Sequence, residues 1–355
     1  MARVGMNPAR RMGRATASSD DPRNSVRSTS KKAAARRVDR SCSATMRAMS
    51  RVASRGAVSA QSSVRATGAE LLSRAQMRIA KSRNIEHWQA GLARWDAEVL
   101  LAHVLGVDAE DDEVLRDSAV SPSQQRRFDA MVQRRLTGEP VNYITGHFRF
   151  AGLDLVVRPG VFSPRASSEL AVDLAVARLR RRRGRRIAVD VATGNGAIAL
   201  AIGAAVTAAE VWGIDISAEA ARLGRLNARR LDLDNVHFAT GDMLAGLPAA
   251  LRGAVQVLTI HPPYVARDEV RTLPVEIRRF EPRHTLTDGS DDGLGLVRRL
   301  ADDAPGWLRP GGHVLVEIAP YLARETATAL RRGGLRDVRS HRDSLGVTRV
   351  VIGQL

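Results

Sequence analysis

Short apolar runs alternate with amphipathic stretches along the second half of the chain, and this alternation predicts a sheet with helices between its strands. Five runs rich in Val, Ile, Leu and Ala have the length of strands that are buried on both faces. They are residues 186–192, 210–216, 236–240, 255–260 and 313–319. Helical stretches separate these runs, which favours βαβ units and a mostly parallel, doubly wound α/β fold.

The end of the chain predicts a different kind of strand pairing. Two strand-like runs, residues 335–341 and 348–352, are joined by a loop that contains Gly346. We expect them to close as a hairpin, which would give the sheet an antiparallel edge. The Rossmann sheets of dehydrogenases lack such an edge.

Apolar residues at three-to-four spacing predict a small helical domain over residues 67–140. One helix covers residues 93–106, and Gly106 ends it. Its expected apolar face is Trp95, Val99, Leu100, Leu101, Val104 and Leu105. Another helix opens at Ser121 and ends at Gly138. Residues 143–157, with two glycines, then predict a β-hairpin within a linker at 141–160, and residues 161–355 form the sheet domain.

Residues 1–66 differ in composition from the rest of the chain. They hold 15 Lys and Arg against 3 acids, so +12 of the net charge of +17 belongs to this segment. Large apolar side chains are almost absent from it, and we therefore expect a disordered basic tail. Three explanations stay open: a mis-assigned start, with Met46 or Met49 the initiator, an organellar transit peptide, or a solvated tail that contacts RNA or ribosomes.

The cysteine and histidine content narrows the chemistry. Cys42 is the one cysteine of the chain and lies in the tail, so no disulfide framework or cysteine metal site is expected. The histidines lack metal-ligand spacing, and no metal is expected. With no apolar run long enough to cross a bilayer, the sequence predicts a cytoplasmic monomer, or a mitochondrial one if the tail is a transit peptide.

Three strand ends carry the residue types of a nucleoside site. A glycine-rich turn follows the first strand, and an acid stands at the end of each of the next two. Such turns let the backbone approach a ligand, and an acid after the second strand can accept hydrogen bonds from ribose hydroxyls. The candidate cofactor-binding residues are Asp190, Ala192, Thr193, Gly194, Asn195, Gly196, Asp215, Asp242, Met243 and His261.

The fourth strand ends in His261-Pro262-Pro263-Tyr264. Prolines fix φ and lack an N–H, so this loop is stiff and presents carbonyl groups and an aromatic face at the edge of the sheet. The turn has the spacing Asp-x-Ala-x-Gly-x-Gly, not G-x-G-x-x-G, and no acid/base for hydride transfer is visible. Together these features favour the methyl donor S-adenosylmethionine as cofactor.

From about residue 70 onward the chain resembles the glutamine N5-methyltransferases of peptide-chain release factors (the HemK type). Five blocks carry the resemblance, in matching order and spacing. They are Arg94–Leu101, Glu139–Gly146, Phe162–Arg165, Phe280–Arg283 and Asp288–Leu294. The resemblance implies a class I S-adenosylmethionine-dependent methyltransferase fold, Rossmann-like with an antiparallel last strand, and a release factor or other translation protein as substrate.

The resemblance also implies roles for single residues. Residues 192–196 would hold the amino-acid part of the donor, Asp215 its ribose, and Asp242 and Met243 its adenine. His261, Pro262, Pro263 and Tyr264 would bind the acceptor glutamine, with His261, Pro262 and Tyr264 as the catalytic residues. In the family the Asn side chain and a Pro carbonyl accept the two amide N–H groups, and Tyr packs on the amide plane.

The chain departs from the family pattern at several positions. His261 stands where the family has Asn, Gln256 where Asp is usual, and Ala192 in place of the first glycine. Ala166 and Ser167 interrupt a Pro-acid pair, and residues 317–320 lack the family's Glu-x-Gly. A neutral imidazole can accept one hydrogen bond, so His261 can stand in for the amide oxygen.

Two further functions stay open beside glutamine methylation. One is methyl transfer to an exocyclic amine of nucleic acid or to a small molecule. The folded part carries only +5, and aromatic residues make up 4% of the chain, so it offers little of the basic, aromatic surface that a nucleic-acid substrate needs. The other is a catalytically silent protein that binds S-adenosylmethionine and has lost acceptor chemistry at His261.

Overall fold

The computed structural model describes residues 66–85, 91–181 and 184–355. By its internal contacts the chain divides into two units, Met1–Gln61 and Ser62–Leu355, and every described residue belongs to the second. The expectations for the tail at 1–66, for Cys42 and for a start at Met46 or Met49 lie outside the described residues, Ala66 excepted. No helix within the described ranges has both the length and the apolar character needed to cross a membrane.

The first described part is helical, as the sequence predicts. Its elements are β1 (Ala66–Thr67), α1 (Gly68–Ala80), α2 (Leu92–Leu105), α3 (Asp112–Asp117), β2 (Ala119–Val120) and α4 (Pro122–Leu136). Capping boxes fix where α1 and α4 begin, since Thr67 pairs with Glu70 and Ser121 with Gln124. The core between them includes Leu71, Ile79, Leu100, Leu101 and Phe128.

The apolar face expected for α2 is wrong at one position. Trp95 is 46% exposed, whereas Asp96, one residue further, is 4% exposed. The buried face of α2 therefore includes a carboxylate, because Arg135 of α4 donates to it at 2.6 Å. Hydrophobic periodicity counts a tryptophan as inward and an aspartate as outward, so it cannot recognise such a pair.

The hairpin is shorter than expected. Tyr143 to Thr145 belong to a short helix, α5 (Val141–Thr145), which Gly146 ends at φ 77°. The strands are β3 (His147–Phe150) and β4 (Leu153–Val156), paired antiparallel. Ala151 and Gly152 connect them with positive φ at both positions, the geometry that suits the twist of a two-residue hairpin turn.

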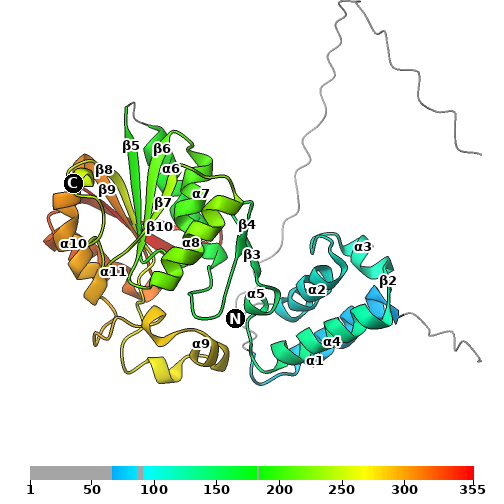
Figure 1. Ribbon diagram of the computed structural model, residues 1–355. Helices are drawn as coiled ribbons and strands as arrows, with labels where there is room; N and C mark the ends of the chain where they lie inside the picture. The colour runs from blue at the N-terminus through cyan, green and yellow to red at the C-terminus, as the bar shows by residue number, and fades with distance from the viewer. Residues whose placement is uncertain (1–65, 86–90, 182–183) are drawn as a thin grey trace, which may run out of the picture. The chain divides into compact units, whose positions relative to one another are not determined.

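One seven-stranded sheet forms the centre of the second part, in the order β10-β11-β9-β8-β5-β6-β7 (Figure 1). The strands lie close to the predicted runs, except that the strand expected at 313–319 begins already at Leu308. They are β5 (Arg186–Val191), β6 (Ala209–Asp215), β7 (Val236–Thr240), β8 (Val255–Ile260), β9 (Leu308–Glu317), β10 (Arg336–Arg342) and β11 (Thr348–Gln354). The last strand, β11, is antiparallel to β9 and β10, as predicted. The hairpin of β10 and β11 forms this edge of the sheet, as predicted, with β10 outermost.

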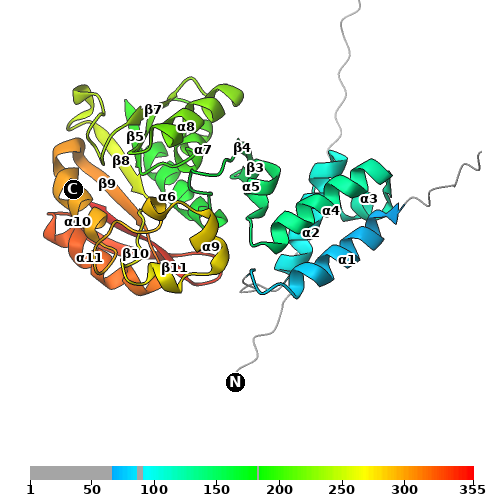
Figure 2. The same cartoon turned by 60° about the horizontal axis from the view of Figure 1, so that its bottom comes forward.

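Helices cover both faces of this sheet, so the fold is doubly wound (Figures 1 and 2). The helices α6 (Glu169–Arg180), α7 (Ala197–Ala205) and α8 (Ala218–Arg230) pack on one face, and α10 (Gly295–Trp307) and α11 (Ala323–Arg332) on the other. Neighbouring residues of a strand enter opposite cores, for example Val257 and Leu258. The central strands β5 and β8 are therefore buried along almost their whole length, which is why their runs could be recognised in the sequence.

The remaining elements are short and lie in the loops. They are η1 (Ala166–Ser168), η2 (Ala249–Leu251), η3 (Val270–Thr272), α9 (Val275–Phe280), η4 (Arg283–Thr285) and η5 (Pro320–Leu322). The chain passes from β5 outward to β6 and β7, then returns to place β8 on the other side of β5. This reversal between β5 and β8 is the topological switch point where open α/β sheets bind ligands.

Candidate functional site

A cavity of about 470 Å³ opens at the carboxyl ends of β5, β6, β7 and β8. A volume in this range fits a bound small molecule. The cavity walls come from the strand ends, from residues 160–165 and from the segment around α9 and η4. Of the predicted site residues, Ala192, Gly194, Asp215, Asp242, Met243 and all of His261 to Tyr264 line it.

The glycine-rich turn after β5 forms the floor of the cavity. Ala192, Gly194 and Gly196 all have positive φ, at 53°, 58° and 88°. A side chain at Gly196 would lie 2.6 Å from the ring of Phe238, so only glycine fits there. Thr193, Asn195 and Gly196 do not line the cavity but shape the turn whose neighbours do. Ala192 holds a left-handed conformation that glycine adopts at lower cost.

Asp215 joins this turn to the end of β6. Its Oδ2 accepts from the backbone N–H of Gly194 at 2.8 Å, and its Oδ1 accepts from that of Ser217 at 2.9 Å. The carboxylate lines the cavity with lone pairs left for a ligand. Beside it, the Ile216 side chain is 66% exposed and also lines the cavity, which offers an apolar surface for a planar ring.

Asp190 supports the turn from below and does not line the cavity. Its side chain is buried, and its two oxygens accept from the hydroxyls of Thr193 at 2.6 Å and Thr259 at 2.7 Å. Burial raises the pKa of this carboxyl to about 7, although the two hydroxyl bonds act in the opposite direction. Asp190 therefore joins the end of β5 to Thr259 near the end of β8 and stabilises the turn.

Asp242 and Met243 form the far wall of the cavity. Met243 is buried at φ 55°, and the Asp242 Oδ2 accepts from Arg299 of α10 at 2.8 Å. Arg299 lines the cavity too. Nothing in the sequence pointed to Arg299, because it lies 57 residues from its partner and only the fold brings the two together.

The segment after β8 is held rigidly by its neighbours. The carbonyl oxygen of Pro263 accepts from the N–H of Asp288 at 3.1 Å, and Tyr264 pairs with Thr287 as an isolated bridge. Across the part of the chain that the structure describes, no hydrogen bond reaches the carbonyl of Pro262. Of the two proline carbonyls, that of Pro262 is therefore the one left for a ligand.

His261 lies between two aromatic rings at the cavity wall. The Tyr264 ring stacks with the imidazole at 5.7 Å and 15°, and the Phe162 ring meets it edge-on at 5.4 Å. The imidazole Nδ1 lies 3.4 Å from Oε2 of Glu317 and 3.5 Å from the Ser168 hydroxyl. Glu317 ends β9, which lies two strands from β5 in the sheet. The sequence did not identify it as a site residue, because its contact with His261 depends on the order of the strands.

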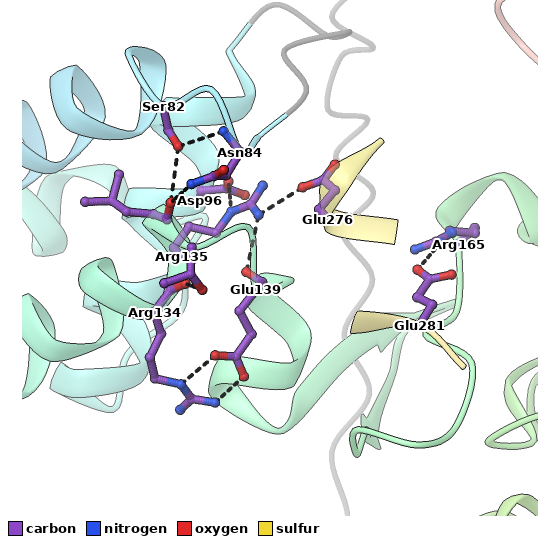
Figure 3. Close-up of polar contacts among 11 residues, drawn as sticks. Ser82, Asn84, Asp96, Arg134, Arg135, Glu139, Arg165, Glu276 and Glu281 are labelled. Atoms are coloured by element: carbon purple, nitrogen blue, oxygen red, sulfur yellow. Dashed lines mark hydrogen bonds and ion pairs between the residues drawn. The ribbon is translucent and has the colours of Figure 1, made fainter. Parts of the chain in front are cut away.

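The segment around α9 connects the cavity with the helical elements. Glu281 lines the cavity and pairs with Arg165, whose guanidinium lies over the Phe162 ring at 4.9 Å. One turn earlier, Glu276 of α9 accepts from Arg135 of α4 at 3.0 Å (Figure 3). The helix α9 thus contacts the helical elements through Glu276 and lines the cavity through Ile277.

Comparisons with known proteins agree with this arrangement. Residues 70–146 match the family model of the PrmC N-terminal domain, and residues 185–261 match a methyltransferase domain. A release factor glutamine methyltransferase of Bordetella pertussis is 37% identical over 265 residues, which cover 75% of this chain and 96% of the relative. One from Rhodospirillum rubrum is 35% identical over 262 residues, 74% of this chain and 78% of the relative.

A solved structure from Alicyclobacillus acidocaldarius is also similar. It is a release factor-specific protein-(glutamine-N5) methyltransferase, 25% identical, with a TM-score of 0.33 over 54% of this chain and 93% of that one.

Proposed function

We propose that this chain, which belongs to the family of release factor glutamine methyltransferases, transfers a methyl group from S-adenosylmethionine to the side-chain amide nitrogen of a glutamine in a peptide-chain release factor. One observation carries the proposal. The stiff His261–Tyr264 loop lines the same cavity as Ala192 and Asp215, which follow or end β5 and β6. A donor and an acceptor therefore fit side by side.

The donor half of the cavity suits an adenosyl group with an amino-acid tail. Asp215 offers carboxylate lone pairs to a pair of ribose hydroxyls, and Ile216 and Met243 offer apolar contact to a planar base. Gly194 gives the turn its φ of 58°, a left-handed conformation that a residue with a side chain adopts only at a cost. When bound, S-adenosylmethionine supplies a methyl group on a positively charged sulfur.

The acceptor half would hold a planar amide by its two N–H groups. The unengaged carbonyl of Pro262 accepts one, and a ring nitrogen of His261 accepts the other. Tyr264 packs against the amide plane. An amide nitrogen is a poor nucleophile because its lone pair is delocalised into the carbonyl, so catalysis depends on orientation and on the charges around it.

The experiment that tests the proposal uses the full chain, donor labelled in its methyl group, and either a purified release factor or RNA as acceptor. We expect label in the release factor. Label in RNA alone would overturn the assignment of the acceptor, and no label in either would favour a protein that binds the donor without transferring its methyl group.

A tyrosine variant tests the acceptor half. Tyr264→Ala removes the ring beside the expected amide, and misplacement of about 1 Å can cost on the order of a hundredfold in rate. We expect a loss of this size in kcat for release factor methylation. Tyr321→Ala is the matched control, because Tyr321 is 65% exposed and does not line the cavity. Equal rates for both variants would contradict the role of Tyr264.

A further inference from the structure

The buried carboxylate of Glu317 has one oxygen without a hydrogen-bond partner. Glu317 is 3% exposed, and its Oε1 accepts from the Ser167 hydroxyl at 3.1 Å. Oε2 forms no hydrogen bond among the described residues. A buried carboxylate oxygen that lacks a donor is costly. The group that lies nearest to offsetting this cost is the imidazole of His261, whose Nδ1 is 3.4 Å away.

The surroundings of His261 fix which of its nitrogens faces which partner. Nδ1 lies toward Glu317 and the Ser168 hydroxyl, and the rings of Phe162 and Tyr264 restrict rotation of the imidazole. A carboxylate accepts and does not donate, so a proton on Nδ1 is the arrangement that satisfies Oε2. Nε2 then carries the lone pair. It makes no hydrogen bond within the described part of the chain and is left for a ligand in the cavity that His261 lines.

We propose that His261 and Glu317 act as a proton-accepting pair for methyl transfer, which rests on the function proposed above. Nε2 of His261 takes a proton from the acceptor amide, and Glu317 is a positioning residue that stabilises the imidazolium. The amide nitrogen forms a bond to the methyl carbon while the bond from carbon to sulfur breaks, with its electron pair going to sulfur. The positive charge that leaves the sulfur thus passes to the imidazolium and is balanced by Glu317.

Other charged groups around His261 do not replace this role. Arg165 approaches from residues 160–165 but is paired with Glu281. On the far side Tyr264 is the neighbouring ring, and burial raises the pKa of its hydroxyl, so it stays protonated. Arg349 of β11 pairs with Asp343 at 3.0 Å. Glu317 is the carboxylate with an oxygen facing the imidazole.

The test compares the rate of release factor methylation as a function of pH in the wild-type chain and in two variants. Since an imidazolium accepts no hydrogen bond, the wild-type rate should fall on the acid side. In Glu317→Gln the imidazolium loses its balancing charge, so kcat should fall by about ten- to a hundredfold. The KM for the release factor and the affinity for S-adenosylmethionine should stay within about twofold.

His261→Asn provides the second comparison. An asparagine oxygen accepts a hydrogen bond and does not titrate, so this variant should lose the acid limb whatever its absolute rate. Glu325→Gln, an exposed change on α11, is the control. An unchanged kcat in Glu317→Gln, or an acid limb that persists in His261→Asn, would overturn the pair and leave glutamine methylation standing.

A measurement on the wild-type chain keeps the proposal testable without turnover. Nitrogen NMR of isotopically labelled histidine, assigned through His261→Asn, reports which ring nitrogen carries the proton. We expect the proton of neutral His261 on Nδ1. A proton on Nε2 would contradict the proposal even if the release factor proved not to be the substrate.

Discussion

At the scale of single residues, three positions that are far apart in the sequence meet beside the cavity. His261 follows β8, Ser167 lies in η1, and Glu317 ends β9. His261 and Ser167 are departures from the family pattern, and Glu317 begins the segment 317–320, which also departs from it. Their contacts give a physical reason for the combination, because Ser167 donates to one oxygen of Glu317 and His261 lies next to the other. The sequence identified His261 but not its partner, since only the sheet order brings β8 and β9 together.

Ala192 is a second departure with a measurable cost. Its φ of 53° lies in the left-handed region, where a Cβ costs roughly 1–2 kcal/mol relative to glycine. Ala192→Gly removes this strain, although the greater freedom of glycine in the unfolded chain offsets part of the gain. We expect the free energy of unfolding to rise by up to about 1 kcal/mol, measured by urea denaturation.

Ala188→Gly in the interior of β5 is the matched control, and it should lower stability because the same change there removes buried contacts. A loss of stability in both variants would mean that the Ala192 backbone is not strained.

Asp190 predicts how stability depends on pH. Its pKa is raised in the folded protein from an ordinary 3.8 to about 7, chiefly by burial. The folded state therefore binds this proton more tightly than the unfolded state. Its contribution to stability is complete below about pH 4 and is lost as the pH rises through about 7.

Asp190→Asn removes this titration. Relative to the variant, the wild-type chain should lose up to about 4 kcal/mol of unfolding free energy between about pH 4 and pH 7, at about 1.4 kcal/mol per unit of pKa. Thermal or urea unfolding at several pH values measures the difference. If the unfolding free energies of the two proteins changed with pH in parallel, the pKa of Asp190 would not be raised by folding.

At the scale of elements, the sequence predicts those segments whose hydrophobic pattern matches their environment. The central strands are buried on both faces, so their apolar runs were visible, and β8 begins and ends at the predicted residues. The predicted start of the hairpin at residue 143 was wrong. Residues 143–145 alternate in character as a strand would, but they belong to the helix α5. The buried Asp96 was missed because its partner, Arg135, is 39 residues away.

The contacts of Arg135 predict a large effect on stability. Its guanidinium is 4% exposed and binds Asp96 of α2 and Glu276 of α9 (Figure 3). Arg135→Met removes the cation that binds the buried Asp96 and the partly buried Glu276, and removing one partner of a buried pair costs about 3–5 kcal/mol. We expect a loss of this order in the free energy of unfolding, measured by urea denaturation.

Arg134→Met, the neighbouring residue on α4, is the matched control. Arg134 is 47% exposed and pairs with Glu139, so its loss should cost no more than about 1 kcal/mol. Similar losses in the two variants would contradict the importance of the buried contacts.

At the scale of the whole molecule, the cavity is lined by residues between Gly160 and Arg299, from several strand ends and from the loops that follow them. In the proposed function the strand ends hold the donor and the β8 loop holds the acceptor, and α9 links the cavity wall to Arg135 of α4. The type of fold and the position of the site could be predicted, because parallel strands place their carboxyl ends at one edge. The partners Arg299, Glu281 and Glu317 could not, because no local pattern marks a contact between distant segments.

Mass spectrometry of a release factor after incubation with the full chain and S-adenosylmethionine tests the central claim most directly. We predict the mass of one added methyl group, which fragmentation places on the side-chain amide of a single glutamine, and a far smaller methylated fraction after the same short incubation with Tyr264→Ala. A methyl group on any other type of residue, or an unmodified release factor beside an enzyme that binds S-adenosylmethionine, would contradict the account.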